Sequence, residues 1–252
     1  MKNLNSDDPL TLKPSDLQVS KIGTLYVIAT PIGNLGDMTL RAVETLKNVD
    51  VLFAEDTRVT RRLLTKFDIQ VPLESYREQV HSAKAARVIG LLRDGKDVGL
   101  VSDAGTPGVS DPGAMLVRDV LQDMPDARIV PAPGPSAVVA AVSVAGFPSD
   151  AFTFFGFPPH KKGRNAFFDE VVDCPHTVVL YESPHRVLKT LGQLAECVPD
   201  RRLCILRELT KMHESSYRCT AAEAVELVSE HVKGEFVIVM EGRRYSDRRN
   251  RK

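Results

Sequence analysis

Three segments of the chain combine glycine, proline and small polar residues more densely than simple connections between helices and strands require. They are TPIGNLGD at 30–37, SDAGTPG at 102–108 and PAPGPSA at 131–137. Glycine allows a ligand to approach the backbone closely and proline fixes a turn, so each segment can hold N–H and C=O groups rigidly toward a ligand. One such segment alone would indicate a tight turn between a strand and a helix. Three of them favour a binding site.

The first segment partly resembles the glycine fingerprint of NAD-binding proteins, because an acidic residue, Glu55, follows it at a distance of about twenty residues. The leading glycine of that fingerprint is missing, and only Gly33 and Gly36 are present. Asp37 stands where its side chain would cap the next helix, and a carboxylate there would repel a pyrophosphate. We therefore expect a ligand without phosphate, such as an adenosine compound with a positive centre.

Acidic residues and one histidine follow predicted strands and are candidates for proton transfer. Glu55 and Asp56 stand in EDTR, Glu182 and His185 in YESPHR, and Glu214 ends RELTKMHE. The alternative for Glu55 and Asp56 is a helix N-terminus, in which Asp56 or Thr57 caps and Glu55 complements the helix dipole. Residue type and spacing leave both interpretations open.

Basic residues near the same segments are candidates for contacts with phosphates. A loop of the sequence FPPHKKGR at 157–164 combines aromatic, proline and basic residues, a mixture that suits stacking and backbone contacts on RNA. Solvated basic surfaces are the alternative, and the same alternative holds for the basic stretch at 243–252. The candidate RNA-binding residues are Arg58, Lys161, Lys162, Arg186 and Lys211.

Strands and helices alternate along the first part of the chain, which predicts a mostly parallel sheet with helices on both faces. A turn-rich break at 146–150 precedes a part richer in aromatic and β-branched strands. We expect a flexible leader at 1–21, an N-terminal α/β domain at 22–147, a C-terminal α/β domain with a mixed sheet at 148–242, and a basic tail at 243–252. The predicted strands are 24–30, 50–54, 97–101, 128–131, 151–157, 176–181, 202–207 and 235–241, and the predicted helices are 38–48, 58–67, 79–93, 113–122, 136–145, 164–172, 184–195 and 221–231.

The composition is that of a globular protein, with 43% hydrophobic residues, 26% charged residues and a formal net charge of zero. Zero net charge argues against a protein that coats nucleic acid by bulk attraction. The four cysteines form no CxxC pair and have no histidine at metal-ligand spacing, which predicts buried thiols and no metal site. No apolar run approaches the ~20 residues that span a bilayer, and 1–21 lack the apolar core of a signal peptide, so we expect a cytoplasmic protein.

Seven motifs, in order, closely resemble those of the 16S rRNA cytidine 2'-O-methyltransferases, a branch of the tetrapyrrole methylase superfamily. They are TLYVIATPIGNLGDMTLRA, FAEDTR, VSDAGTPGVSDPG, PGPSA, FGFPP, YESPHR and RELTKMHE, and the resemblance covers about 23–242. The resemblance implies two α/β domains with S-adenosylmethionine in the cleft between them. It also implies a homodimer that methylates a cytidine ribose of 16S rRNA in the 30S subunit.

The resemblance further implies which residues hold the cofactor. It places S-adenosylmethionine against all three Gly/Pro-rich loops, with the backbone at Leu180–Tyr181 and that of a later strand of the second domain completing the adenine site. The residues are Pro31, Gly33, Asp103, Ala104, Gly105, Thr106, Pro133, Gly134, Ser136, Leu180 and Tyr181. The first loop holds fewer glycines than the superfamily usually shows, which favours the RNA-modifying branch over a tetrapyrrole substrate.

Three other functions stay open at this point. The chain could methylate a carbon of a tetrapyrrole, bind an adenosine ligand without catalysis, or use NAD. In a methyl transfer to a ribose hydroxyl, positioning of donor and acceptor is expected to dominate, and Glu55, Asp56, Glu182, His185 or Glu214 would take the proton.

Overall fold

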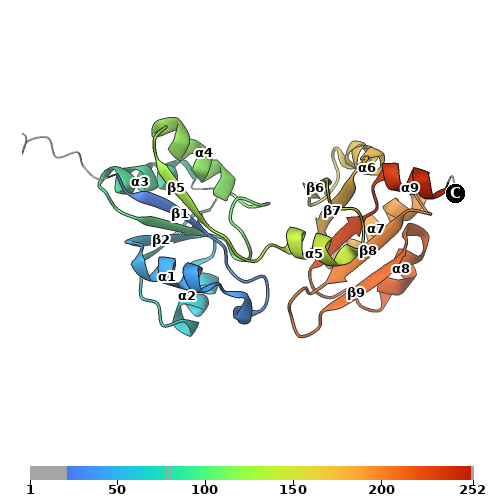
Figure 1. The fold of residues 1–252 in the computed structure, drawn as a ribbon, viewed down its shortest axis with the longest axis horizontal. Helices are drawn as coiled ribbons and strands as arrows, with labels where there is room; N and C mark the ends of the chain where they lie inside the picture. The colour runs from blue at the N-terminus through green and yellow to red at the C-terminus, as the bar shows by residue number, and fades with distance from the viewer. Residues whose placement is uncertain (1–21, 78, 80, 251–252) are drawn as a thin grey trace, which may run out of the picture.

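The computed structural model describes residues 22–77, 79 and 81–250, and for 248–250 the backbone alone. These residues form two lobes, each built on a five-stranded sheet, and the chain crosses from one to the other between β5 (Arg128–Ala132) and α5 (Ala137–Ala145) (Figure 1). The expected leader at 1–21 lies outside the described residues.

The first sheet is entirely parallel, as the alternation of strands and helices predicts. Its order is β3-β2-β4-β1-β5. Its other strands are β1 (Thr24–Ile28), β2 (Val51–Ala54), β3 (Leu73–Ser75) and β4 (Val98–Val101). Leu25 of β1 lies opposite Val98 on one side and Ile129 on the other. The edge strand β3 was not predicted, because three half-buried residues are too few to show a period of two.

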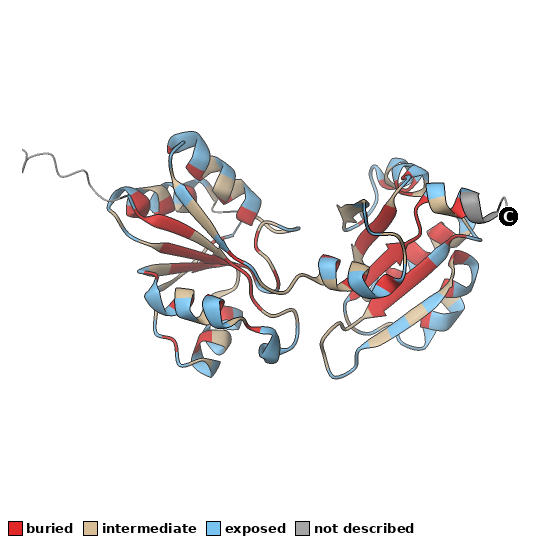
Figure 2. Cartoon of the chain, viewed as in Figure 1, coloured by how far each residue is buried: buried red, intermediate tan, exposed pale blue. Residues whose placement is uncertain are grey.

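Helices cover both faces of this sheet, which is expected when parallel strands are joined by crossovers (Figure 1). On one face α1 (Leu40–Asn48) and α2 (Thr57–Lys66) pack on Ile28, Leu52 and Ala54. On the other face α3 (His81–Arg93) and α4 (Gly113–Asp123) pack on Leu25, Phe53 and Leu100. The central strands β2 and β4 are accordingly buried almost throughout, whereas the edge strands β3 and β5 are partly exposed (Figure 2).

The second sheet is mixed, in agreement with the sequence prediction. Its order is β6-β7-β10-β8-β9, and of its neighbouring pairs only β6 and β7 run parallel. The strands are β6 (Phe152–Gly156), β7 (Thr177–Glu182), β8 (Arg202–Arg207), β9 (Ser215–Thr220) and β10 (Phe236–Met240). The polar sequence SSYRCT concealed β9, which is an edge strand with alternate residues exposed.

Alternate residues of β10 serve two different cores. Phe236 and Ile238 face the core shared with α6 (Arg164–Asp173), α7 (Val187–Cys197) and α8 (Ala221–Ser229), whereas Val237 faces α5. Val138 and Ala141 of α5 pack with Val237 in the core on the other face of the second sheet. The chain therefore passes from the first lobe to the second before α5. The sequence predicts a boundary after that helix, at 147/148, because composition reveals the turn-rich segment but not the sheet against which α5 packs.

Two further expectations need correction. The segment expected to be a basic tail begins with a helix, α9 (Arg243–Asn250), whose Arg243 forms an ion pair with Asp173 at 3.2 Å. Cys197 is exposed, although Cys174 and Cys204 are buried as expected. Among the described residues, no helix has both the length and the apolar character needed to cross a membrane.

Candidate active site between the two lobes

The three Gly/Pro-rich loops meet at the carboxyl edge of the first sheet. From the adjacent strands β1 and β4 the chain leaves in opposite directions, to β2 on one side and to β5 on the other. Such a switch point is where open α/β sheets bind their ligands. The loops at 30–37 and 102–108 follow these two strands, so the topology places them on either side of the switch point.

Hydrogen bonds join the loops into one rigid unit. The backbone N–H groups of Thr30 and Gly105 donate to each other's carbonyl oxygens at 2.9 and 3.1 Å. The hydroxyl of Thr106 donates to the carbonyl oxygen of Pro135 in the third loop, at 3.1 Å. Gly105 has a φ of 79°, a left-handed conformation that a residue with a side chain adopts only under strain.

The expected role of Asp37 was wrong. Asp37 ends a short 3-10 helix, η2 (Leu35–Asp37), and Thr39 caps α1 by accepting a hydrogen bond from the N–H of Ala42 at 3.1 Å. The extra turn between the loop and α1 carries the carboxylate away from the cap position. The position of Asp37 therefore gives no reason to exclude NAD.

A cavity of about 510 Å³ lies over these loops, and both lobes line it. The first lobe contributes Ile32, Glu55, Ser102, Asp103, Ala104, Gly105, Thr106, Val109, Ser110 and Asp111. The crossing into α5 contributes Ser136 and Ala137. The second lobe contributes Phe157, Tyr181, Glu182, Ser183, Pro184, Leu209, Lys211, Glu235, Phe236 and Val237. Apolar walls with a few polar groups are typical of a small-molecule site.

The predicted cofactor residues divide into two groups. Those in the cavity wall are Asp103, Ala104, Gly105, Thr106, Ser136 and Tyr181. The others, Pro31, Gly33, Pro133, Gly134 and Leu180, are not among the residues that line the cavity. Leu180 is fully buried in the core of the second lobe, and Gly134 lies so close to Ala29 that a Cβ atom would come within 3.0 Å of the alanine Cβ.

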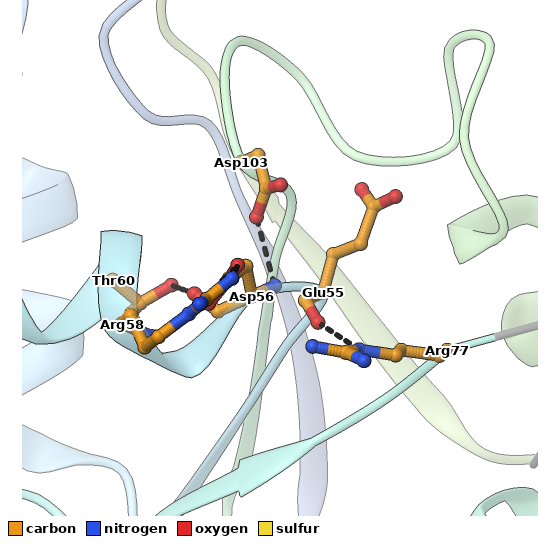
Figure 3. Close-up of polar contacts among 6 residues, drawn as sticks. All are labelled: Glu55, Asp56, Arg58, Thr60, Arg77 and Asp103. Carbon is orange, nitrogen blue, oxygen red and sulfur yellow. Dashed lines mark hydrogen bonds and ion pairs between the residues drawn. The ribbon is translucent and has the colours of Figure 1, made fainter.

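Among the predicted acids, Glu55 is the one whose carboxylate is presented to the cavity without a partner (Figure 3). Its backbone oxygen accepts from Arg77 at 3.2 Å, but among the described residues no hydrogen bond engages its side chain. Partial burial, followed by the charges of Asp103 and Asp111, raises its pKa above the ordinary value of 4.5. A carboxylate with a raised pKa in a cavity suits proton transfer.

Asp56 has the capping role that the sequence left as the alternative. Its side chain accepts from the backbone N–H of Arg58 at 2.8 Å, which caps α2, and forms an ion pair with the Arg58 guanidinium at 2.6 Å. The hydrogen bond from the Arg58 side chain and the one from its backbone hold the pKa of Asp56 well below its usual range. The N–H of Asp56 also donates to Asp103 at 2.8 Å, which fixes the second loop against α2 (Figure 3).

Glu182 lies in the cavity wall, but its carboxylate is already engaged. Its side chain is fully buried and accepts from the N–H of Ser183 at 2.7 Å and from the Thr190 hydroxyl at 2.6 Å. It also forms an ion pair with Arg186 at 2.8 Å. Arg186 is therefore paired with Glu182 and is not a free cation, and the hydrogen bonds of Glu182 are those of a structural carboxylate.

The remaining predicted residues lie farther from the chemistry. His185, Glu214, Lys161 and Lys162 are exposed, outside the cavity wall as the described residues define it. Glu214 accepts from the N–H of Thr210 at 2.5 Å and closes the turn that follows β8. Arg58 has an 83% exposed side chain and is paired with Asp56.

Lys211 is the predicted cation that reaches the cavity. Its ammonium group forms ion pairs with Glu208 at 2.8 Å and Glu235 at 2.9 Å. Burial lowers the pKa of Lys211, but these carboxylates outweigh that effect and raise it. Its stem lies against Gly33 of the first lobe, where a Cβ atom would come within 2.4 Å of the lysine Cγ. Gly33 is therefore needed for contact between the lobes.

Several cavity residues were not predicted. Val109, Ser110 and Asp111 follow the second loop directly and belong to the motif VSDAGTPGVSDPG, which was the available signal. Ser110 has a φ of 66°, a strained conformation for a residue with a side chain. Nothing in the sequence distinguishes Glu235, which reaches the site because β10 is central in the second sheet.

Comparisons with known proteins agree with this architecture. The sequence profile of the family described as Tetrapyrrole (Corrin/Porphyrin) Methylases matches residues 24–225. The chain is 46% identical over 232 residues to "Ribosomal RNA small subunit methyltransferase I" of Neisseria meningitidis serogroup B, covering 90% of this chain and 78% of that protein. It is 41% identical over 223 residues to the protein of the same name from Thermotoga maritima, covering 88% and 100%.

Solved structures share the fold at lower sequence identity. Uroporphyrin-III-C-methyltransferase from Thermus thermophilus has a TM-score of 0.61 and 21% identity, covering 87% of this chain and 94% of that one. A diphthine synthase has a TM-score of 0.67 and 11% identity, covering 87% and 90%. These likenesses confirm the expected pair of α/β domains.

Proposed function

The chain belongs to the tetrapyrrole methylase family, and from that premise we propose that it transfers a methyl group from S-adenosylmethionine to RNA of the small ribosomal subunit. The observation that carries the proposal is the 46% identity, over 90% of the chain, to a protein named for that substrate. The preserved order of the seven motifs supports the finer assignment, which is the 2'-oxygen of a cytidine ribose in 16S rRNA.

The cavity fits S-adenosylmethionine in size and chemistry. Its volume of about 510 Å³ falls within the roughly 300–1,000 Å³ of small-molecule sites. Asp103, Gly105, Thr106 and Ser136 would hold the cofactor, and the apolar walls at Ile32 and Val109 would exclude water. The carboxylates of Glu55, Asp103 and Asp111 suit a positively charged sulfonium. When bound, the cofactor supplies an activated methyl group.

The proton of the acceptor hydroxyl goes to Glu55 in this proposal. General-base catalysis needs a carboxylate that faces the cavity and is free to accept a proton. Asp56 is committed to the cap of α2, Glu182 to a buried network and Glu214 to a turn, whereas the Glu55 side chain is free. Its raised pKa makes it a better proton acceptor than an ordinary glutamate.

We also propose that the enzyme is a cytoplasmic homodimer. On α5, Val139 is 61% exposed and Val144 is 47% exposed, and a second copy would cover such apolar side chains. Sedimentation of the purified chain tests this assembly, with Val139→Asp as the disruptive variant. A monomer at all protein concentrations would refute the proposed homodimer.

Incubation with radiolabelled S-adenosylmethionine tests the proposed function. The acceptors are unmodified 30S subunits, naked 16S RNA and a tetrapyrrole precursor, each in a separate reaction. We expect label on a cytidine 2'-oxygen with 30S subunits, located by nuclease mapping. Label on the tetrapyrrole alone would overturn the RNA assignment, and cofactor binding with no transfer to any acceptor would overturn the proposal that the chain is a methyltransferase acting on RNA.

A further inference from the structure

The loop between β6 and α6, residues 157–163, begins at the cavity and continues over the surface; we call it the FPP loop. Phe157 lines the cavity yet is 49% exposed. Its ring packs edge-on against Tyr181, with centroids 5.5 Å apart. His160, Lys161 and Lys162 follow on the exposed side. The loop thus combines a half-open aromatic ring at the cavity mouth with a basic surface beside it.

Two arginines from different elements hold this loop by consecutive carbonyl groups. Arg186 donates to the carbonyl oxygen of Pro158 at 2.8 Å, and Arg164 donates to that of Pro159 at 2.9 Å. Proline has no N–H group, so the carbonyl oxygens are the backbone groups by which this stretch can be held. With both of them bound and both φ angles fixed by proline rings, the position of Phe157 relative to the cavity is fixed as well.

A buried network ties the two arginines together. Glu182 pairs with Arg186 at 2.8 Å and accepts from the Thr190 hydroxyl at 2.6 Å. The same hydroxyl accepts from Arg164 at 2.8 Å. Glu182, Thr190 and Arg164 are 5% exposed or less. The Glu182 carboxylate supplies one negative charge against the two positive charges of Arg164 and Arg186. Burial lowers the pKa of the Arg164 guanidinium.

We propose, building on the proposed function, that the FPP loop is the platform on which the acceptor RNA rests. The base of a nucleotide stacks on the exposed face of Phe157, and Lys161 and Lys162 contact the flanking phosphates. Arg164, Arg186 and Glu182 are positioning residues that hold the platform. An aromatic ring next to cations suits single-stranded nucleic acid, because every base has a face that can stack and every linkage carries a negative charge.

Substitution of Phe157 tests the stacking directly. Stacking on an aromatic side chain contributes about 1–3 kcal/mol per base, so Phe157→Ala should weaken binding of a fluorescent oligoribocytidine by about tenfold. Phe157→Tyr should retain the affinity. The control is Phe152→Ala, because Phe152 is 40% exposed at the opposite end of β6. Equal affinities for wild type and Phe157→Ala would overturn the proposal.

The salt dependence of binding tests the two lysines. Each phosphate contact to a single strand contributes about 0.7 to the slope of log affinity against log salt concentration. The double variant Lys161→Ala/Lys162→Ala should therefore flatten the slope by about 1.4. Lys47→Ala/Lys66→Ala removes the same charge from exposed positions on the first lobe and should leave the slope unchanged. An unchanged slope in the Lys161/Lys162 variant would remove these lysines from the platform.

A double-mutant cycle distinguishes a positioning role of Arg186 from direct phosphate contact. Arg186→Lys keeps the charge but cannot reach Glu182 and Pro158 together. If Arg186 acts through the loop, Arg186→Lys should weaken binding in wild type and have little further effect in Phe157→Ala. Fully additive losses would overturn the positioning role. Arg164→Lys, which leaves Arg186 in place, repeats the cycle through Pro159 should Arg186→Lys fold poorly.

Failure of the RNA platform and failure of the proposed methyl transfer give different experimental results. If the wild-type chain methylates 30S subunits but Phe157→Ala does so with an unchanged KM, the platform is wrong and the proposed function stands. If no RNA is methylated, the proposed function fails, and the oligoribocytidine titration still decides whether Phe157 binds nucleotides. Calorimetry with S-adenosylmethionine should give the same affinity in wild type and Phe152→Ala, because Phe152 lies outside the cavity wall.

Discussion

Thr190→Val is the most direct test of the buried network that supports the cavity wall. Thr190 is fully buried on α7, where its hydroxyl donates to Glu182 at 2.6 Å and accepts from Arg164 at 2.8 Å. Valine has the same shape and is also β-branched, so neither a cavity nor a change of rotamer freedom enters. A hydrogen bond to a charged group contributes about 1.5–3 kcal/mol, so the loss of two should lower the free energy of unfolding by about 3 kcal/mol or more.

The matched control is Thr177→Val in β7 of the same lobe. Thr177 is 1% exposed, and its hydroxyl donates to the carbonyl oxygen of Pro148 at 2.6 Å. One hydrogen bond to a neutral acceptor predicts a loss of about 1 kcal/mol. Urea unfolding followed by far-ultraviolet circular dichroism measures both, because the chain has no tryptophan. If Thr190→Val costs no more than Thr177→Val, the network does not stabilise the lobe as argued.

Three further predictions concern the cavity. Glu55→Gln should lower kcat by about a hundredfold or more. It should also remove the acidic limb of the kcat–pH profile, which in the wild type lies above pH 4.5 because the pKa of Glu55 is raised. An unchanged profile would exclude Glu55 as the base. The folded protein holds the proton of the Glu55 carboxyl more tightly than the unfolded chain does, so the free energy of unfolding of the wild type falls as pH rises through the raised pKa of Glu55. In urea titrations, Glu55→Gln should not show this fall. Asp56→Asn keeps an oxygen to cap α2 and should retain kcat near the wild-type value, and a loss as large as that of Glu55→Gln would give Asp56 a chemical role. Gly33→Val should weaken binding of S-adenosylmethionine in calorimetry by about tenfold, because the valine Cβ would displace Lys211, whereas Gly36→Ala should not weaken it. Lys211→Ala in the Gly33→Val background should restore part of the affinity. No restoration would contradict the contact between the lobes.

Local sequence patterns were enough to predict most of the elements. Alternation of strands and helices indicated the parallel first sheet, and the three Gly/Pro-rich loops marked the edge at which the cavity lies. These features are local, because a loop that must expose its backbone next to a ligand needs glycine and proline wherever it folds. The short edge strand β3 and the polar edge strand β9 were missed because their pairing depends on a neighbour and not on their own apolar pattern.

The roles of individual charged residues were decided only by the tertiary structure. By sequence alone, Glu55, Asp56 and Glu182 are all carboxylates that follow strands and are candidates for proton transfer. Folding leaves the first free in the cavity, commits the second to a helix cap and buries the third beneath two arginines. Arg186 changes in the same way from a candidate phosphate ligand to a residue that holds a loop.

The sequence by itself thus determined the family, the fold class and the edge of the sheet that binds a ligand. The tertiary structure decided which side of the lobe boundary α5 belongs to, how Lys211 of one lobe meets Gly33 of the other, and which acid is free to accept a proton. The physical reason is that hydrogen-bond partners and burial of a charged group come from residues distant in the chain, and these partners determine its pKa and availability.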